Sequence, residues 1–70
     1  MTKLEAIQQM KVGQKLTHRH FTNDEWVTME KSISHQYIIK LEDGVKCTQE
    51  QFWKWRTDES WNFDWEIFKN

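Results

Sequence analysis

Two histidines, an arginine and a phenylalanine stand at consecutive positions in the segment LTHRHFTNDEW, which runs from Leu16 to Trp26. If this segment is a strand, His18 and His20 project to one face, because side chains alternate along a strand. Two imidazoles on one face are able to bind a metal ion, and His35 or Cys47 would have to complete the site. The chain lacks the paired Cys-x-x-Cys ligands typical of structural zinc sites. Partly exposed strand histidines are therefore the favoured interpretation, and no metal site is predicted.

Other residues with catalytic side chains also have simpler explanations. Cys47 lies between an expected hairpin return and a helix cap, with no known nucleophile motif around it. Asp64 and Glu66 share one face of an expected strand, where carboxylates are usually solvated. Gly13 and Gly44 are isolated, so they form no glycine-rich phosphate loop. We predict a protein that is not an enzyme and has no cofactor.

Positive charge next to aromatic rings favours binding over catalysis. Stacking platforms for planar ligands combine these two features, and Arg19 adjoins His20 and Phe21. The net charge of the chain is −1, so it has no basic excess with which to hold DNA or RNA, and nucleic-acid binding is not expected. A small planar ligand or a protein surface remains. The predicted ligand-binding residues are Lys15, Arg19, Phe21 and Trp26.

A short helix is expected to lead into this segment. Thr2 and Glu5 have the spacing of a capping box, and apolar residues then recur at helical intervals. Gly13 is placed to end the helix in a left-handed conformation. The apolar residues are Leu4, Ile7 and Met10.

Alternating and turn-forming residues predict a set of antiparallel strands. Strands are expected over 15–21 and 25–31, joined by a turn at TNDE, and over the segment HQYIIKLEDG, where Tyr37, Ile39 and Leu41 would share a face. Asp43–Gly44 predicts a two-residue hairpin turn, with VKC as a brief return strand.

The last third of the chain predicts a second helix and a final strand. Thr48 and Gln51 repeat the capping-box spacing, and the helix is expected to end near Arg56 or Thr57. The segment WNFDWEIF, from 61 to 68, alternates apolar and polar residues as a strand does. Its apolar face would hold Trp61, Phe63, Trp65 and Ile67.

The predicted fold is one α+β domain over residues 1–70, with a small antiparallel sheet of about four strands and two short helices. Five Trp, four Phe and one Tyr supply most of the core of so short a chain. A single cysteine excludes an internal disulfide and suits a reducing cytoplasm. No membrane-spanning or signal segment is expected, and self-association would help stabilise so small a domain.

The opening LEAIQQMKVGQKLTHRHF resembles a family of small bacteriophage accessory proteins that begin with an "EAL..LK.G..V.R..W" pattern and end in DWE followed by an aliphatic residue. Phe21 takes the place of the usual tryptophan, and DWEI is found at 64–67. The family's longer central segment is replaced here by a compact one. The residues that match the opening pattern are Glu5, Ala6, Ile7, Met10, Gly13 and Leu16.

Some members of that family are anti-defence proteins of the anti-Thoeris kind, which oligomerise and sequester cyclic nucleotide signals of bacterial immunity. The resemblance implies a non-enzymatic phage or prophage accessory protein, located in the host cytoplasm, which captures a nucleotide-derived signal. Arg19 or Lys15 would then contact its phosphates while an aromatic ring stacks on its base. The alternative is a protein-interaction module that inhibits a host protein through exposed tryptophans and the acidic C-terminal half.

Overall fold

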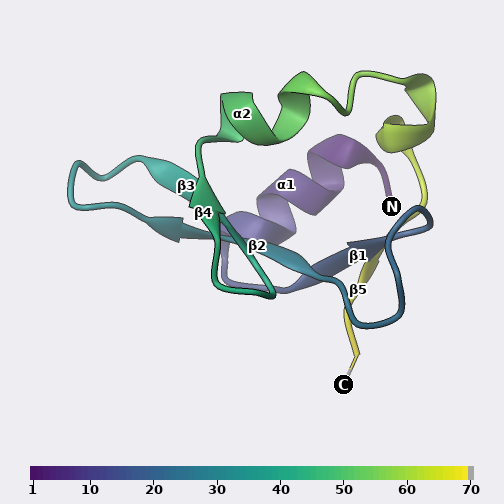
Figure 1. The fold of residues 1–70 in the computed structure, drawn as a ribbon, viewed down its shortest axis with the longest axis horizontal. Coiled ribbons are helices and arrows are strands. Elements are labelled where there is room, and N and C mark those ends of the chain that lie inside the picture. The colour runs from purple at the N-terminus through teal and green to yellow at the C-terminus, as the bar shows by residue number, and fades with distance from the viewer. Residues whose placement is uncertain (70) are drawn as a thin grey trace.

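A five-stranded antiparallel sheet with the strand order β4-β3-β2-β1-β5 forms the centre of the protein, and two helices lie on one of its faces (Figure 1). This computed structural model describes residues 1–69. The predicted α+β fold is confirmed, with five strands where about four were expected. The elements in chain order are α1 (Lys3–Lys11), β1 (Leu16–His18), β2 (Val27–Lys31), β3 (Tyr37–Leu41), β4 (Lys46–Cys47), α2 (Gln49–Lys54), the 3₁₀-helix η1 (Glu59–Asn62) and β5 (Trp65–Ile67).

Both predicted capping boxes are present. Thr2 Oγ1 accepts a hydrogen bond from Glu5 N at 3.2 Å, and the Glu5 carboxylate accepts from Thr2 N at 2.8 Å. Thr48 and Gln51 make the same reciprocal pair at the start of α2, with both distances 3.0 Å. Each box satisfies two backbone N–H groups that have no partner within the helix.

The end of α1 is also as predicted, whereas α2 is shorter than expected. Gly13 has φ = +95°, and its N–H donates to Met10 O at 3.0 Å, which closes a Schellman-type end. The helix α2 ends at Lys54, because Trp55 is the C-cap and projects outward with 80% of its surface exposed. Trp55 therefore does not share the buried side of α2 with Phe52.

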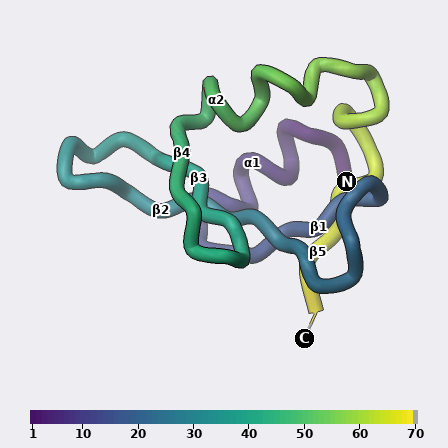
Figure 2. Tube along the Cα trace, viewed as in Figure 1, coloured from purple at the N-terminus to yellow at the C-terminus, as the bar shows by residue number. Residues whose placement is uncertain are grey.

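Alternation along the strands divides the sheet into a buried face and an open face. On β1 and β2 every second side chain points towards the helices and is buried. Thr17 and Thr28 stand between these buried positions and are only half-buried. Among residues 1–69, no helix covers the second face (Figure 1). The path of the chain in Figure 2 likewise keeps α1 and α2 on the same side. The core consists of Ala6, Met10, Leu16, Val27, Met29, Ile39, Phe52 and Trp65.

The first strand is shorter than the predicted 15–21. It ends at His18, because Phe21 N donates to His18 O at 2.8 Å and closes a turn. The turn at TNDE is present, with Glu25 N donating to Thr22 O at 3.2 Å, and β2 begins after it at Val27.

The last strand is likewise shorter than the predicted 61–68. The Asp58 carboxylate accepts from Ser60 N at 2.8 Å and starts the 3₁₀-helix η1, which takes Trp61 out of the strand. Asp64 then has φ = +68°, and this interrupts the alternation before β5 begins. As a result Phe63 is 53% exposed while Trp65 is fully buried, so they do not share a face.

The expected two-residue turn at Asp43–Gly44 is a three-residue loop instead. Gly44 N donates to Leu41 O and Leu41 N to Val45 O, both at 2.9 Å, with φ = +86° at Gly44. This is the hairpin in which the third loop residue is left-handed. The β2–β3 loop repeats it: His35 N donates to Ser32 O at 2.9 Å, and His35 has φ = +64°.

Because a left-handed backbone strains every residue with a Cβ, His35→Gly is expected to raise the free energy of unfolding by about 0.5–1 kcal/mol. The matched change in the other loop, Gly44→Ala, should lower it by about 1 kcal/mol; no neighbouring atom lies within 4 Å of the added Cβ, so the cost is conformational. Urea denaturation followed by circular dichroism measures both. Equal midpoints for the wild type and His35→Gly would show that the loop is unstrained.

Candidate functional site

The four predicted ligand-binding residues lie in two neighbouring pairs at the β1 end of the sheet. Lys15 and Trp26 form one pair, with the Lys15 ammonium 4.5 Å from the centroid of the Trp26 ring. Arg19 and Phe21 form the other and help to line a shallow pocket of about 400 Å³. The pocket is lined by Thr17, His18, Arg19, Phe21, Thr22, Asn23, Asp64 and Glu66.

Thr17 connects the two pairs on the open face. Leu16 is paired with Val27 and Thr17 with Glu66, so the antiparallel register brings Trp26 next to Thr17 on its other side. We refer to Lys15, Thr17, Arg19 and Trp26 as the β1 surface. It presents two exposed cations, a hydroxyl group and a half-buried indole ring.

Arg19 is held by a weak ion pair at the edge of the pocket. Its guanidinium lies 3.4 Å from the Asp64 carboxylate, and both side chains are about half exposed. An exposed single-contact ion pair of this kind contributes only about 0–1 kcal/mol to stability. A stronger anion therefore has little to overcome in displacing Asp64 from Arg19.

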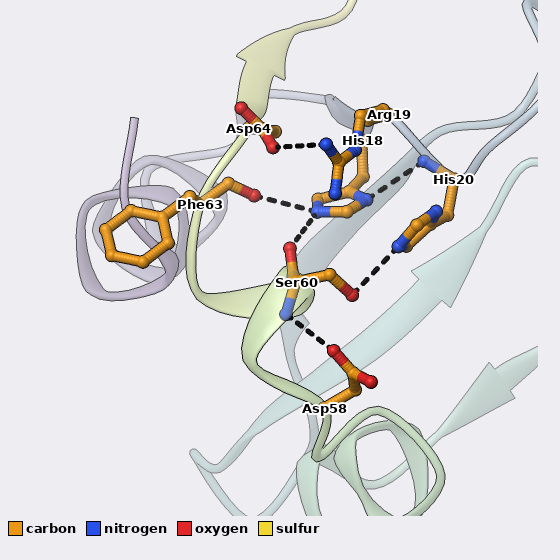
Figure 3. Close-up of polar contacts among 7 residues, drawn as sticks. All are labelled: His18, Arg19, His20, Asp58, Ser60, Phe63 and Asp64. Carbon is orange, nitrogen blue, oxygen red and sulfur yellow. Dashed lines mark hydrogen bonds and ion pairs between the residues drawn. The ribbon is translucent and has the colours of Figure 1, made fainter.

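Asp64 is a site residue that the sequence reasoning missed. It was assigned to a solvated strand face together with Glu66, but it lies before β5 with a left-handed backbone and faces Arg19 (Figure 3). Aspartate tolerates this conformation better than most residues do. Asp64 stands at a polar position of the alternation, so the periodicity carried no signal that the strand begins only after it.

Phe21 is committed mainly to the core. Its ring packs edge-on against Trp65, with centroids 5.8 Å apart, and lies 5.9 Å from the Trp61 ring. Only part of the ring remains for the pocket, since Phe21 is half-buried. Phe21 was predicted to stack on a ligand. In the structure its ring forms part of the pocket wall and offers little free surface for stacking.

His18 forms the inner wall of the pocket and is 4% exposed, so the prediction of a partly exposed histidine is wrong for this residue. Its Nε2 lies 2.8 Å from Phe63 O and 3.0 Å from Ser60 O, and its Nδ1 accepts from His20 N at 3.0 Å (Figure 3). Two carbonyl oxygens on Nε2 and an N–H on Nδ1 require the neutral tautomer that carries its proton on Nε2. All hydrogen-bonding capacity of the ring is used.

Burial lowers the pKa of His18, because the charged ring would lose its hydration. The carbonyl groups of Ser60 and Phe63 oppose this effect but do not cancel it. The ring also stacks on Trp61, with centroids 4.3 Å apart and planes inclined by 27°. His18 is therefore a neutral wall residue near pH 7 and adds no positive charge to the pocket.

His20 is exposed, as predicted, and its Nε2 lies 2.9 Å from Ser60 Oγ. A serine and a histidine at this distance resemble two members of a catalytic triad, but the nearby Asp58 carboxylate accepts from Ser60 N instead of orienting the His20 ring.

Burial raises the pKa of the Cys47 thiol, which lowers its reactivity as a nucleophile. Within residues 1–69, no three His, Cys, Asp or Glu side chains are grouped to hold a metal ion.

Comparisons with protein-family models, curated proteins and solved structures found no match to this chain. The resemblance to anti-Thoeris phage proteins therefore stays a prediction. Across the part of the chain that the structure describes, no helix has the length and apolar character needed to cross a bilayer. The β1 surface and the pocket beside it are therefore the features that bear on function.

Proposed function

We propose that the protein acts by binding, without catalysis, and that it captures a small nucleotide-like ligand on the β1 surface. One observation carries the proposal: Thr17 has the Lys15–Trp26 pair on one side and Arg19 on the other. The two cations would contact phosphate oxygens, Thr17 would donate from its hydroxyl group, and the indole would take the planar base. In this proposal the protein is a phage or prophage accessory protein that works in the host cytoplasm.

The two carboxylates of the pocket set a condition on the ligand. Asp64 and Glu66 repel a phosphate group, so the anion must take Arg19 from Asp64 to gain affinity. A phosphate offers two oxygens that can pair with two of the guanidinium nitrogens, whereas the present contact with Asp64 uses a single nitrogen. The exchange therefore favours a ligand that engages two nitrogens of Arg19 at once over the single contact that Asp64 makes.

A protein partner is the second candidate, and one observation favours it. Leu4 is 75% and Phe63 is 53% exposed, and both line a shallow apolar pocket of about 360 Å³ between α1 and the segment before β5. Exposed apolar pairs of this kind are found at protein interfaces. Trp55 is the one tryptophan with a largely exposed ring among residues 1–69, so the expected group of exposed tryptophans is absent there.

Two substitutions in the Arg19–Asp64 ion pair test the first proposal, because one removes a positive charge and the other a negative charge. Arg19→Ala should weaken binding of a cyclic dinucleotide or cyclic ADP-ribose analogue by about tenfold to a hundredfold, because a hydrogen bond to a charged group contributes about 1.5–3 kcal/mol. Asp64→Asn should leave the affinity unchanged or tighten it by up to about fivefold, since it removes a competitor worth about 0–1 kcal/mol. Isothermal titration calorimetry measures both changes.

The matched control is Lys54→Ala, which removes one positive charge from exposed α2 at a distance from the β1 surface. It should bind like the wild type. If Arg19→Ala and Lys54→Ala weaken binding equally, the effect is one of net charge, and the β1 surface is not the site. If Arg19→Ala binds normally and Phe63→Ala abolishes capture of a protein partner, the second candidate replaces the first.

A further inference from the structure

His18 joins two segments that border the pocket, and it uses a different ring nitrogen for each. On one side Nε2 holds the carbonyl oxygens of Ser60 and Phe63, at the two ends of the η1 region. On the other side Nδ1 accepts from His20 N, within a turn that Phe21 N closes onto His18 O at 2.8 Å. We call residues 18–21 the His18 turn. Figure 3 shows the ring between these two sets of contacts.

The two sides respond differently to a proton. Because Nε2 already carries hydrogen, the remaining lone pair on Nδ1 is where a proton adds. Once Nδ1 is protonated, it presents a donor to the His20 N–H at the present distance of 3.0 Å, and that hydrogen bond is lost. The contacts of Nε2 with Ser60 O and Phe63 O are kept and strengthened, since a charged donor binds carbonyl oxygens more tightly.

We propose that His18 is a proton-operated latch, in which protonation of Nδ1 releases the His18 turn while the η1 region stays attached to the ring. Arg19 and Phe21 belong to the released turn. Loss of the bond from His20 N would thereby free the Arg19 guanidinium from its fixed position opposite Asp64, whereas the hydrogen bond from Phe21 N to His18 O does not involve the ring and is kept.

Burial of the ring places the transition on the acid side of the ordinary histidine pKa. Burial and the nearby His20 lower the pKa of His18, whereas the two carbonyl groups and Asp64 raise it. The result lies below the ordinary histidine value of about 6.5. The charged groups that act on the ring are His20 and Asp64. The other charged side chains on the neighbouring segments are Arg19, Arg56, Asp58, Glu59 and Glu66.

The release of the turn does not depend on any ligand. If the proposed function is also correct, acidification would weaken ligand binding, because Arg19 is one of the two phosphate contacts; this consequence alone rests on the proposed function. The test below uses the ligand-free protein, so a failure of the latch and a failure of the binding proposal are separate results.

An NMR titration of the ligand-free protein from about pH 8 to about pH 4 tests the latch, because it brackets the ordinary histidine pKa. The His18 ring Hε1 and the amides of Arg19 and His20 are expected to shift with one common midpoint, while the amide of Ile39 in β3, two strands away from β1, stays in place. A His20 amide that does not follow the His18 ring overturns the proposal. So does an amide of the buried Ile39 that moves together with the ring, since that would be general unfolding.

Two variants separate the latch from titration of the neighbouring histidine. In His18→Asn the side-chain oxygen is placed to accept from the N–H two residues later, as in an Asx-turn, but it does not titrate near neutral pH. Its His20 amide is expected to show no transition. In His20→Gln the amide of residue 20 should still follow the His18 ring. If His18→Asn does not fold, the shared midpoint in the wild type and in His20→Gln still decides the question.

Discussion

Replacing Trp65 by alanine is expected to lower the free energy of unfolding by about 3–5 kcal/mol, the largest effect of any substitution that we propose. Trp65 is fully buried and lies against four other rings of the core. Its Nε1 also donates to Trp61 O at 2.8 Å, so truncation removes a hydrogen bond as well as a large apolar surface. The rings within reach of Trp65 are those of His18, Phe21, Trp53 and Trp61.

For 70 residues at about 0.05–0.15 kcal/mol each, this loss is a large share of the total stability. Urea denaturation followed by far-ultraviolet circular dichroism measures it without relying on tryptophan fluorescence. Trp55→Ala is the matched control: the same side chain is removed where it is 80% exposed, and a change within about 0.5 kcal/mol is expected. Similar losses in both variants would contradict the core that we describe.

The second large effect is expected for His18→Phe, at about 2–4 kcal/mol. The phenyl ring keeps the stacking on Trp61 but leaves Ser60 O, Phe63 O and His20 N without their partner. Each buried polar group left unpaired costs about 1–3 kcal/mol, and partial access to water reduces the sum. Phenylalanine retains the ring, so the measured loss reports the polar contacts.

The same variant tests the pH dependence of stability. The pKa of His18 is lowered in the folded state, so the unfolded chain binds the proton more tightly at that position. The contribution of His18 is therefore complete above about pH 6.5 and is lost as the pH falls through the lowered pKa, by at most about 1.4 kcal/mol per pH unit. His18→Phe should lack this acid-sensitive component. His20→Phe, at an exposed position, should retain it, and loss of the component in both variants would contradict the assignment to His18.

Local rules predicted the helix starts and the general fold correctly. The Thr2 and Thr48 capping boxes depend on residues three positions apart, and Gly13 ends α1 through its own backbone freedom. Alternation also placed Tyr37–Leu41 in a strand, because one side of that strand must be buried. These features were readable because each follows from neighbours in the chain.

The candidate site was only partly predictable. Lys15, Arg19, Phe21 and Trp26 were selected for their side-chain chemistry, and the structure brings them to one end of the sheet in two pairs. Their individual roles differ, however, because Phe21 is largely used by the core and Arg19 is paired with a carboxylate far away in the chain. That carboxylate belongs to Asp64. Its left-handed backbone cannot be predicted from the periodicity of the sequence.

The amino-acid sequence by itself determined the helix caps, the antiparallel α+β class and the aromatic character of the core, since capping, periodicity and composition act over short distances. Tertiary structure alone decided that His18 is buried and neutral, because its three hydrogen-bond partners come from the next turn and from carbonyl groups more than forty residues away. It also decided where β5 begins, since Trp61 stacks on His18 instead of joining Trp65 in a strand. Contacts between distant segments outweighed the local alternation at that point, and they produced the pocket.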